Sequence, residues 1–177
     1  MKPDRATAFI AACLATVVAV GLLFAGEKKN GSALAAAAPG PGGASNLSLS
    51  PGLSFTDDSS AAFPIRGENL SDGKIASDRP TAIFFGTSHC WNTNREAERF
   101  VALYRKHRDE ARFLVVDLEN ASPDQRELVG RFYRGAIPTV AFLDPKGNVV
   151  YDRAGETARE RGDASELEKI LRTANSR

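Results

Sequence analysis

A single cysteine at the predicted start of a helix is the residue of this sequence best suited to do chemistry. Cys90 follows an apolar run at residues 81–86 and a short loop, and Thr93 stands three positions after it. A second cysteine in the place of Thr93 would complete a Cys-x-x-Cys pair, which is a strong sign of dithiol redox chemistry. Because the chain has threonine there, redox chemistry at this place must depend on one sulfur atom.

The residues around Cys90 indicate that its sulfur can react as a thiolate. The free N–H groups and the dipole of a helix N-terminus favour negative charge, and His89 and Arg95 add positive potential. The hydroxyl or the backbone N–H of Thr93 is placed to hydrogen-bond the sulfur, and Trp91 is interpreted as an exposed aromatic for partner contact. Such a thiolate forms mixed disulfides or is oxidised by peroxide to a sulfenic acid. The alternative is a small apolar residue that packs without reacting.

The elements predicted around Cys90 alternate between strands and helices. Apolar runs predict strands, the last two forming a hairpin, at residues 81–86, 112–118, 139–143 and 148–151. Helical spacing and an N-cap with a capping-box Gln predict helices at residues 90–107, 122–135 and 164–173. Residues 62–79 are predicted to add a strand near 63–66 and a short helix. Helical crossovers make the strands that helices separate, at 81–86, 112–118 and 139–143, parallel to one another. With the final hairpin, we therefore expect an α/β fold with a mixed sheet of four or five strands covered by helices on both faces. The charged side chains of residues 96–108 are interpreted as the solvated face of their helix.

The first 60 residues differ in composition from the rest. Residues 6–26 carry no charge, follow Lys2 and Arg5, and are long enough as a helix to cross a hydrocarbon core of about 30 Å. We therefore expect residues 1–29 to be a signal-anchor that holds the protein on a membrane with its domain outside the cytoplasm, periplasmic in a bacterium. The alternative is a cleaved signal and a secreted protein. A Gly-, Ala-, Pro- and Ser-rich flexible linker is expected at 30–60, and one globular domain at 61–177.

Composition excludes several classes of function. Lys and Arg number 23 against 22 Asp and Glu, so there is no basic field for nucleic acid. The chain has two cysteines and two histidines, and Cys13 lies in the N-terminal apolar run, so no metal-ligand cluster is expected. No cofactor is expected either. The partners we expect are a protein thiol or disulfide and, through the N-terminal helix, a membrane.

The order of these features resembles the thioredoxin superfamily. A buried strand, Cys90 at a helix start, and an Ile137-Pro138-Thr139 segment before a later strand follow one another as in that family, and the resemblance covers residues 80–171. It implies a thioredoxin-like fold, a cis peptide bond at Pro138, and a backbone docking edge at Ile137 and Pro138 opposite the cysteine. Three departures from the family pattern are present, and one of them is Trp91-Asn92 in the place of the usual Gly-Pro between the cysteines. Phe84 stands in the place of the buried acidic residue, and Thr93 in the place of the resolving cysteine.

The resemblance implies an oxidoreductase that lacks its resolving cysteine. Such a monothiol protein would carry out thiol–disulfide exchange, or capture a partner as a mixed disulfide, outside the cytoplasm. Cys90 would be the nucleophile, Thr93 and Pro138 would complete the catalytic set, and partner contacts would come from His89, Trp91 and Ile137. One alternative is a redox-inactive module that uses the same groove for protein binding or assembly. A minor alternative is a thiol peroxidase, because Thr87 precedes Cys90 in the Thr-x-x-Cys spacing of peroxiredoxins.

Overall fold

The computed structural model describes residues 43–177 of the 177-residue chain. Its central sheet has the strand order β4-β3-β5-β6. The middle strands run antiparallel to each other, β4 is parallel to β3, and β6 returns antiparallel to β5. The bounds are β3 at Thr81–Gly86, β4 at Arg112–Asp117, β5 at Thr139–Leu143 and β6 at Val149–Ala154. The mixed sheet expected from the sequence is therefore confirmed. The parallel crossover expected between the strands at 112–118 and 139–143 is wrong, because β5 runs antiparallel to β3.

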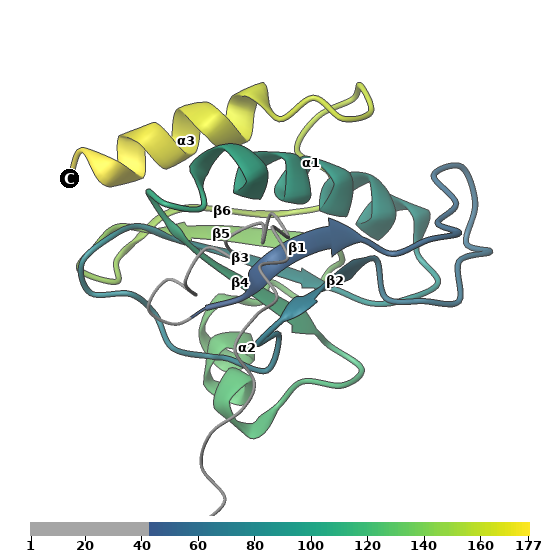
Figure 1. The fold of residues 1–177 in the computed structure, drawn as a ribbon, viewed down its shortest axis with the longest axis horizontal. Helices are drawn as coiled ribbons and strands as arrows, with labels where there is room; N and C mark the ends of the chain where they lie inside the picture. Colours follow the sequence, from purple (N-terminus) through teal and green to yellow (C-terminus); the bar gives the residue numbers. More distant parts are fainter. Residues whose placement is uncertain (1–42) are drawn as a thin grey trace, which may run out of the picture. The chain divides into compact units, whose positions relative to one another are not determined.

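Helices cover both faces of this sheet. Figure 1 shows α1 (Trp91–His107) and α3 (Ser165–Asn175) on one side and α2 (Arg126–Phe132) on the other. The short 3-10 helix η1 (Pro123–Gln125) leads into α2, and it starts with the predicted capping box between Ser122 and Gln125. Together these elements form the thioredoxin-like α/β fold that the sequence resemblance implied.

The central strand β3 explains why its sequence is an unbroken apolar run. All six residues of β3 are buried, and successive side chains point to opposite faces of the sheet. Phe84 joins the core cluster beneath α1 and α3, whereas Ile83 and Phe85 join the cluster beneath α2. A strand that is buried on both faces has no solvent-facing positions, so its apolar residues do not alternate with polar ones. Because it is packed on both faces, it gives a rigid support to the segment that follows.

A second, two-stranded sheet corrects the predicted domain boundary. It pairs β1 (Ser45–Leu49) with β2 (Ile65–Glu68) in antiparallel orientation. The sequence placed β1 inside a flexible linker at 30–60, and for the described part of that segment this prediction is wrong. Leu47 is 3 % exposed and belongs to the core cluster beneath α1, and the N–H of Asn46 donates to the Tyr104 hydroxyl at 2.8 Å. The buried leucine and the backbone N–H hold this strand against the rest of the domain. These two groups leave the segment rich in Gly and Ser, so its composition does not reveal that it is ordered.

The region before β3 is partly as predicted. β2 lies within two residues of the strand expected at 63–66. Residues 69–80 are described and contain no helix, so the short helix expected there is wrong. The expected signal-anchor at 1–29 lies outside the described residues. None of the helices within residues 43–177 has both the length and the apolar character needed to cross a membrane.

The docking of β1 gives a testable prediction. Replacing Leu47 with alanine should lower the free energy of unfolding by about 2–4 kcal/mol, because a buried leucine side chain leaves a cavity in the core. Val149→Ala is the control, since Val149 is 42 % exposed and should cost less than about 1 kcal/mol. Urea denaturation measures both. Equal losses in the two variants would mean that the segment is the loose linker its composition indicates.

Candidate functional site

Cys90 lies where the central strand gives way to the first long helix. β3 ends at Gly86, a three-residue loop follows, and Cys90 is the N-cap residue of α1 with an extended backbone (φ −145°, ψ 107°). The preceding residue, His89, is exposed and adopts φ 50°, in the left-handed region that residues other than glycine rarely enter. Cys90 itself is half-buried and is the one free cysteine of the described residues. It makes no side-chain capping hydrogen bond to the helix.

Thr93, in the place of a resolving cysteine, is fully buried under the start of α1. A Cβ atom added to Gly86 would lie 2.5 Å from the Thr93 Cγ2 methyl carbon, so only glycine allows this turn of helix to approach the end of β3. The Thr93 hydroxyl finds no hydrogen-bond partner within residues 43–177. The hydrogen bond from this hydroxyl to the cysteine sulfur, expected from the sequence, is therefore not formed.

The position of the missing acidic residue is part of the core. Phe84 is fully buried and packs against the rings of Phe63 and Phe100, with centroid separations of 6.4 and 5.5 Å. Its ring also lies close to Gly86, where an added Cβ would come within 2.9 Å of it. The place where the family pattern has a carboxyl group is thus filled by a buried aromatic ring that packs against two others.

The Ile137–Pro138 peptide bond is cis, as the resemblance implied. Thr139, the next residue, pairs with Phe85 near the end of β3, which brings Pro138 to the same edge of the sheet as Cys90. The Pro138 carbonyl accepts a hydrogen bond of 2.7 Å from the N–H of Gly155. Ile137, whose side chain is half-buried, immediately precedes this proline at the same edge.

A strap formed by residues 54–60 lies against the start of α1, and the sequence analysis did not predict it. The buried Asn94 side chain donates to the Ser54 carbonyl (2.6 Å) and the Ser60 hydroxyl (2.9 Å), and the N–H of His89 donates to the Ser60 carbonyl (3.0 Å). The exposed Asp58 carboxylate then accepts the N–H of Trp91 at 2.9 Å. The strap therefore supplies the cap that the Cys90 side chain does not.

A buried ionic network follows on the next turns of α1. Glu96 and Arg99 are both fully buried and pair at 2.8 Å. Glu96 also accepts hydrogen bonds from the backbone N–H and the hydroxyl of Thr157, while Arg99 donates to the carbonyls of Ala158 and Glu160. The interpretation of residues 96–108 as a solvated face is therefore wrong at Glu96 and Arg99, because the loop between β6 and α3 covers these two charges.

This loop also reaches the residues beside Cys90. Arg95 pairs with Glu156 at 2.9 Å and places its guanidinium 5.3 Å from the centre of the Trp91 ring. Trp91 is consequently half-buried rather than a freely exposed aromatic. Since Gly155 in the same loop binds Pro138, one segment ties the cis-proline edge to the first turns of α1.

A second carboxylate approaches Cys90 from the other side. Glu119, in the loop after β4, accepts hydrogen bonds from the Ser88 hydroxyl (2.5 Å) and the Ser88 N–H (3.3 Å). These two donors hold the pKa of the exposed Glu119 carboxyl below its usual value. The sequence analysis did not predict that Glu119 and Asp58 lie near Cys90, because neither residue is close to Cys90 in the chain.

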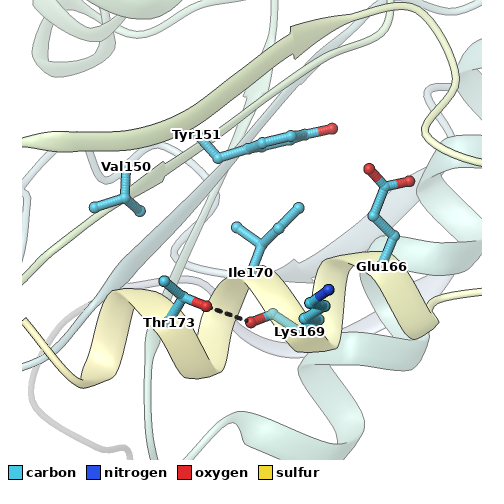
Figure 2. Close-up of a pocket in the computed structure, with 6 residues that line it drawn as sticks. All are labelled: Val150, Tyr151, Glu166, Lys169, Ile170 and Thr173. Carbon is cyan, nitrogen blue, oxygen red and sulfur yellow. Dashed lines mark hydrogen bonds between the residues drawn. The ribbon is translucent and has the colours of Figure 1, made fainter.

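Two cavities lie outside these contacts. A groove of about 580 Å³ opens between β2 and the end of β4, lined among others by Phe63, Ile65 and Val115. A smaller pocket of about 250 Å³ lies between β6 and α3, where Figure 2 shows Tyr151 and Ile170. Burial, and then the Glu166 charge, raise the pKa of the Tyr151 hydroxyl. In the described part of the chain no three His, Cys, Asp or Glu side chains converge in a way that would hold a metal ion.

The fold and the site together define a thioredoxin-like domain with one thiol at the start of its first long helix and a cis proline at the same sheet edge. No family profile and no curated protein matches the sequence. Solved structures of thioredoxins do align with it. They include thioredoxin-2 of the malaria parasite, with 14 % identity, 54 % of this chain and 84 % of that chain covered, and a TM-score of 0.45.

Two further thioredoxins align at similar levels. The germline-specific Deadhead thioredoxin of Drosophila melanogaster has 21 % identity, covers 54 % of this chain and 81 % of its own, and has a TM-score of 0.42. The thioredoxin of Malassezia sympodialis has 19 % identity, covers 59 % and 79 %, and also has a TM-score of 0.42. Similarity at this level assigns no activity, substrate or partner to the chain.

The buried pair of α1 gives a testable prediction. Removing one charge, in Glu96→Gln or Arg99→Met, should destabilise the fold by about 3–5 kcal/mol, because the other charge stays buried without its partner. The double variant should cost less than the sum of the two single variants. The exposed pair of Glu127 and Arg131 is the control, and breaking it should cost less than about 1 kcal/mol. Chemical denaturation of the four variants decides the point, and additive single costs would contradict a coupled buried pair.

Proposed function

We propose that this protein is a thioredoxin-like monothiol that exchanges with disulfides through Cys90. The observation that carries the proposal is the arrangement at the sheet edge. A half-buried thiol at the N-cap of α1 shares that edge with cis-Pro138, and the residue in the resolving position is a fully buried threonine. The arrangement retains a nucleophile and a backbone docking edge.

The proposed reaction has one covalent step on this protein. The Cys90 thiolate attacks one sulfur of a partner disulfide, a bond forms between the two sulfurs, and the second sulfur of the partner leaves as a thiolate. A second, external thiol then attacks the mixed disulfide and releases Cys90. In dithiol proteins the external thiol is replaced by a cysteine in the same chain. Among the residues described here no second cysteine exists to do this.

The structure also favours capture over turnover because of what surrounds the sulfur. Thr93 cannot attack a disulfide, and the core position that carries an acid in the family pattern is filled by Phe84, which cannot accept a proton. A mixed disulfide at Cys90 therefore persists until an outside thiol arrives. We infer that the natural partner is a protein disulfide that is held, rather than one that is processed rapidly.

Trapping tests this function and gives a testable prediction. Incubation of the full chain with glutathione disulfide should give a stable mixed disulfide at Cys90, located by peptide mapping and absent in Cys90→Ser. The variant Thr93→Cys restores the spacing of a dithiol. Its mixed disulfide should break down roughly 100-fold faster or more, because the attacking thiol is held beside the bond. The released glutathione and the new internal disulfide are measured by mass spectrometry.

The opposite outcome has a defined meaning. A folded wild-type chain whose Cys90 is modified neither by glutathione disulfide nor by the cationic disulfide cystamine would contradict the exchange function. The second candidate, a redox-inactive module for protein binding or assembly, would then gain support, and the apolar groove between β2 and β4 is the feature that favours it. A partner that binds wild type and Cys90→Ser equally is the result expected of such a module.

We also propose that the protein acts outside the cytoplasm while anchored to a membrane. The support is the uncharged run at 6–26 behind two basic residues. The prediction is that the chain stays in the membrane fraction after alkaline washing and keeps its original N-terminus by mass spectrometry. Replacing two residues of the apolar run, Val17 and Leu22, with aspartate should abolish this, since each charge in a membrane span costs about 2.5–3.5 kcal/mol on an insertion scale. A soluble product that begins near residue 36 would mean that the signal is cleaved.

A further inference from the structure

Two anchored carboxylates flank the reactive sulfur, one on each side along the chain. Asp58 accepts the N–H of Trp91, the residue after Cys90, at 2.9 Å. Glu119 accepts the N–H and the hydroxyl of Ser88, two residues before Cys90, at 3.3 and 2.5 Å. They come from separate segments, the strap at 54–60 and the loop after β4, and both are exposed. Since consecutive Cα atoms are about 3.8 Å apart, both carboxylates lie within roughly 10 Å of Cys90.

The position of Asp58 is fixed by the strap that carries it. Asn94 and His89 hold the two ends of the strap by hydrogen bonds to Ser54 and Ser60. The adjacent Asp57 adds a third carboxyl group, and hydrogen bonds from Ser59 and Ser54 keep its pKa below the usual value. The negative charge of the strap is thus held at the start of α1.

The positive groups on the elements around Cys90 do not balance these carboxylates. Arg95 is engaged by Glu156 and Arg99 by Glu96. Arg161 pairs with Glu98. His89, next to the cysteine, and Arg159, in the loop after β6, are exposed and have no ion-pair partner among the described residues, and they are fewer than the three carboxylates. At an ionic strength of 0.1 M the Debye length is about 10 Å, so a charged reagent at the sulfur experiences the two carboxylates.

We propose that Asp58 and Glu119 determine the specificity of Cys90 by repelling anionic reagents and favouring partners with basic residues around their reacting cysteine. The inference rests on the proposed exchange function and deepens it. Glutathione disulfide, which is anionic, is then a slow reagent, and a protein disulfide flanked by lysine or arginine is a fast one. The covalent step is unchanged: the Cys90 thiolate displaces one sulfur of the disulfide as a thiolate, and the carboxylates act only on the approach of the reagent.

Alkylation tests the specificity without relying on exchange. The rate constants of Cys90 with neutral iodoacetamide and with anionic iodoacetate are measured on the full chain, with the modified cysteine identified by peptide mapping. Their ratio is divided by the same ratio for the urea-unfolded chain, which removes the intrinsic difference between the reagents. We expect the folded chain to disfavour iodoacetate by about tenfold at low salt, from about threefold per carboxylate. The preference should shrink at high salt.

Two charge-neutral variants identify the source. Asp58→Asn keeps an oxygen that can accept the Trp91 N–H, and Glu119→Gln keeps one for Ser88, so the contacts remain while the charge is lost. Each should lower the preference about threefold, and together they should nearly abolish it. Asp78→Asn is the control, because that exposed carboxylate precedes β3 at the opposite end of a six-residue strand, roughly 20 Å away. It should leave the ratio unchanged.

The outcomes separate the inference from the function on which it rests. A folded chain with no preference against iodoacetate, or one whose preference survives both substitutions, overturns the role of the carboxylates. A chain that shows the preference but forms no mixed disulfide with cystamine, a cationic disulfide, overturns the exchange function and leaves the electrostatic effect standing. If the electrostatic preference and the exchange function are both observed, cystamine should react with Cys90 faster than glutathione disulfide. Asp58→Asn and Glu119→Gln should each reduce this difference in rate.

Discussion

The close approach of α1 to the end of β3 is the constraint on which the site depends. At Gly86 the strand has no side chain, and the Thr93 methyl group and the Phe84 ring occupy the space that a Cβ would need. This contact sets how far the helix can descend onto the sheet and therefore where its N-cap lies. Cys90 is held at that N-cap by the backbone alone, because its thiol takes no part in capping. A sulfur that is not engaged by the helix remains available to a reagent.

The buried ionic network extends this constraint to the rest of the edge. Glu96 and Arg99 would be costly to bury separately, but together they bind the Thr157 N–H and hydroxyl and two loop carbonyls, so their polar groups are largely satisfied. The loop that they hold carries Gly155, which donates to the Pro138 carbonyl. The cis-proline edge and the helix that carries the cysteine are thus fastened to one segment. A change in the network would alter the position of both.

The sequence could predict the elements whose signals are local. The apolar run of β3, the capping box before α2 and the Ile-Pro-Thr segment each follow from neighbouring residues. The succession of elements predicted a mixed sheet but not the antiparallel direction of β5 against β3. β1 could not be predicted, because its docking rests on Leu47 and on a hydroxyl from Tyr104, 58 residues further along the chain. The burial of Glu96 and Arg99 was missed for the same reason. The sequence of the helix shows that these two residues are charged, but the loop that buries them lies about 60 residues further along the chain.

The departures from the family pattern at positions 84 and 93 are physically consistent with each other. A buried carboxyl group beneath a dithiol is useful for moving the proton of the second thiol, and it costs free energy to desolvate. Where the second thiol is absent, that proton transfer is not needed and the acid would be a cost without a use. An aromatic ring at position 84 removes the cost and adds contacts with Phe63 and Phe100. Control of the remaining thiol then falls to groups at the surface, where Asp58 and Glu119 are anchored to the backbone on either side of it. A surface carboxylate acts on the reagent that arrives rather than on a proton inside the protein, and that is the kind of control a single-thiol site can use.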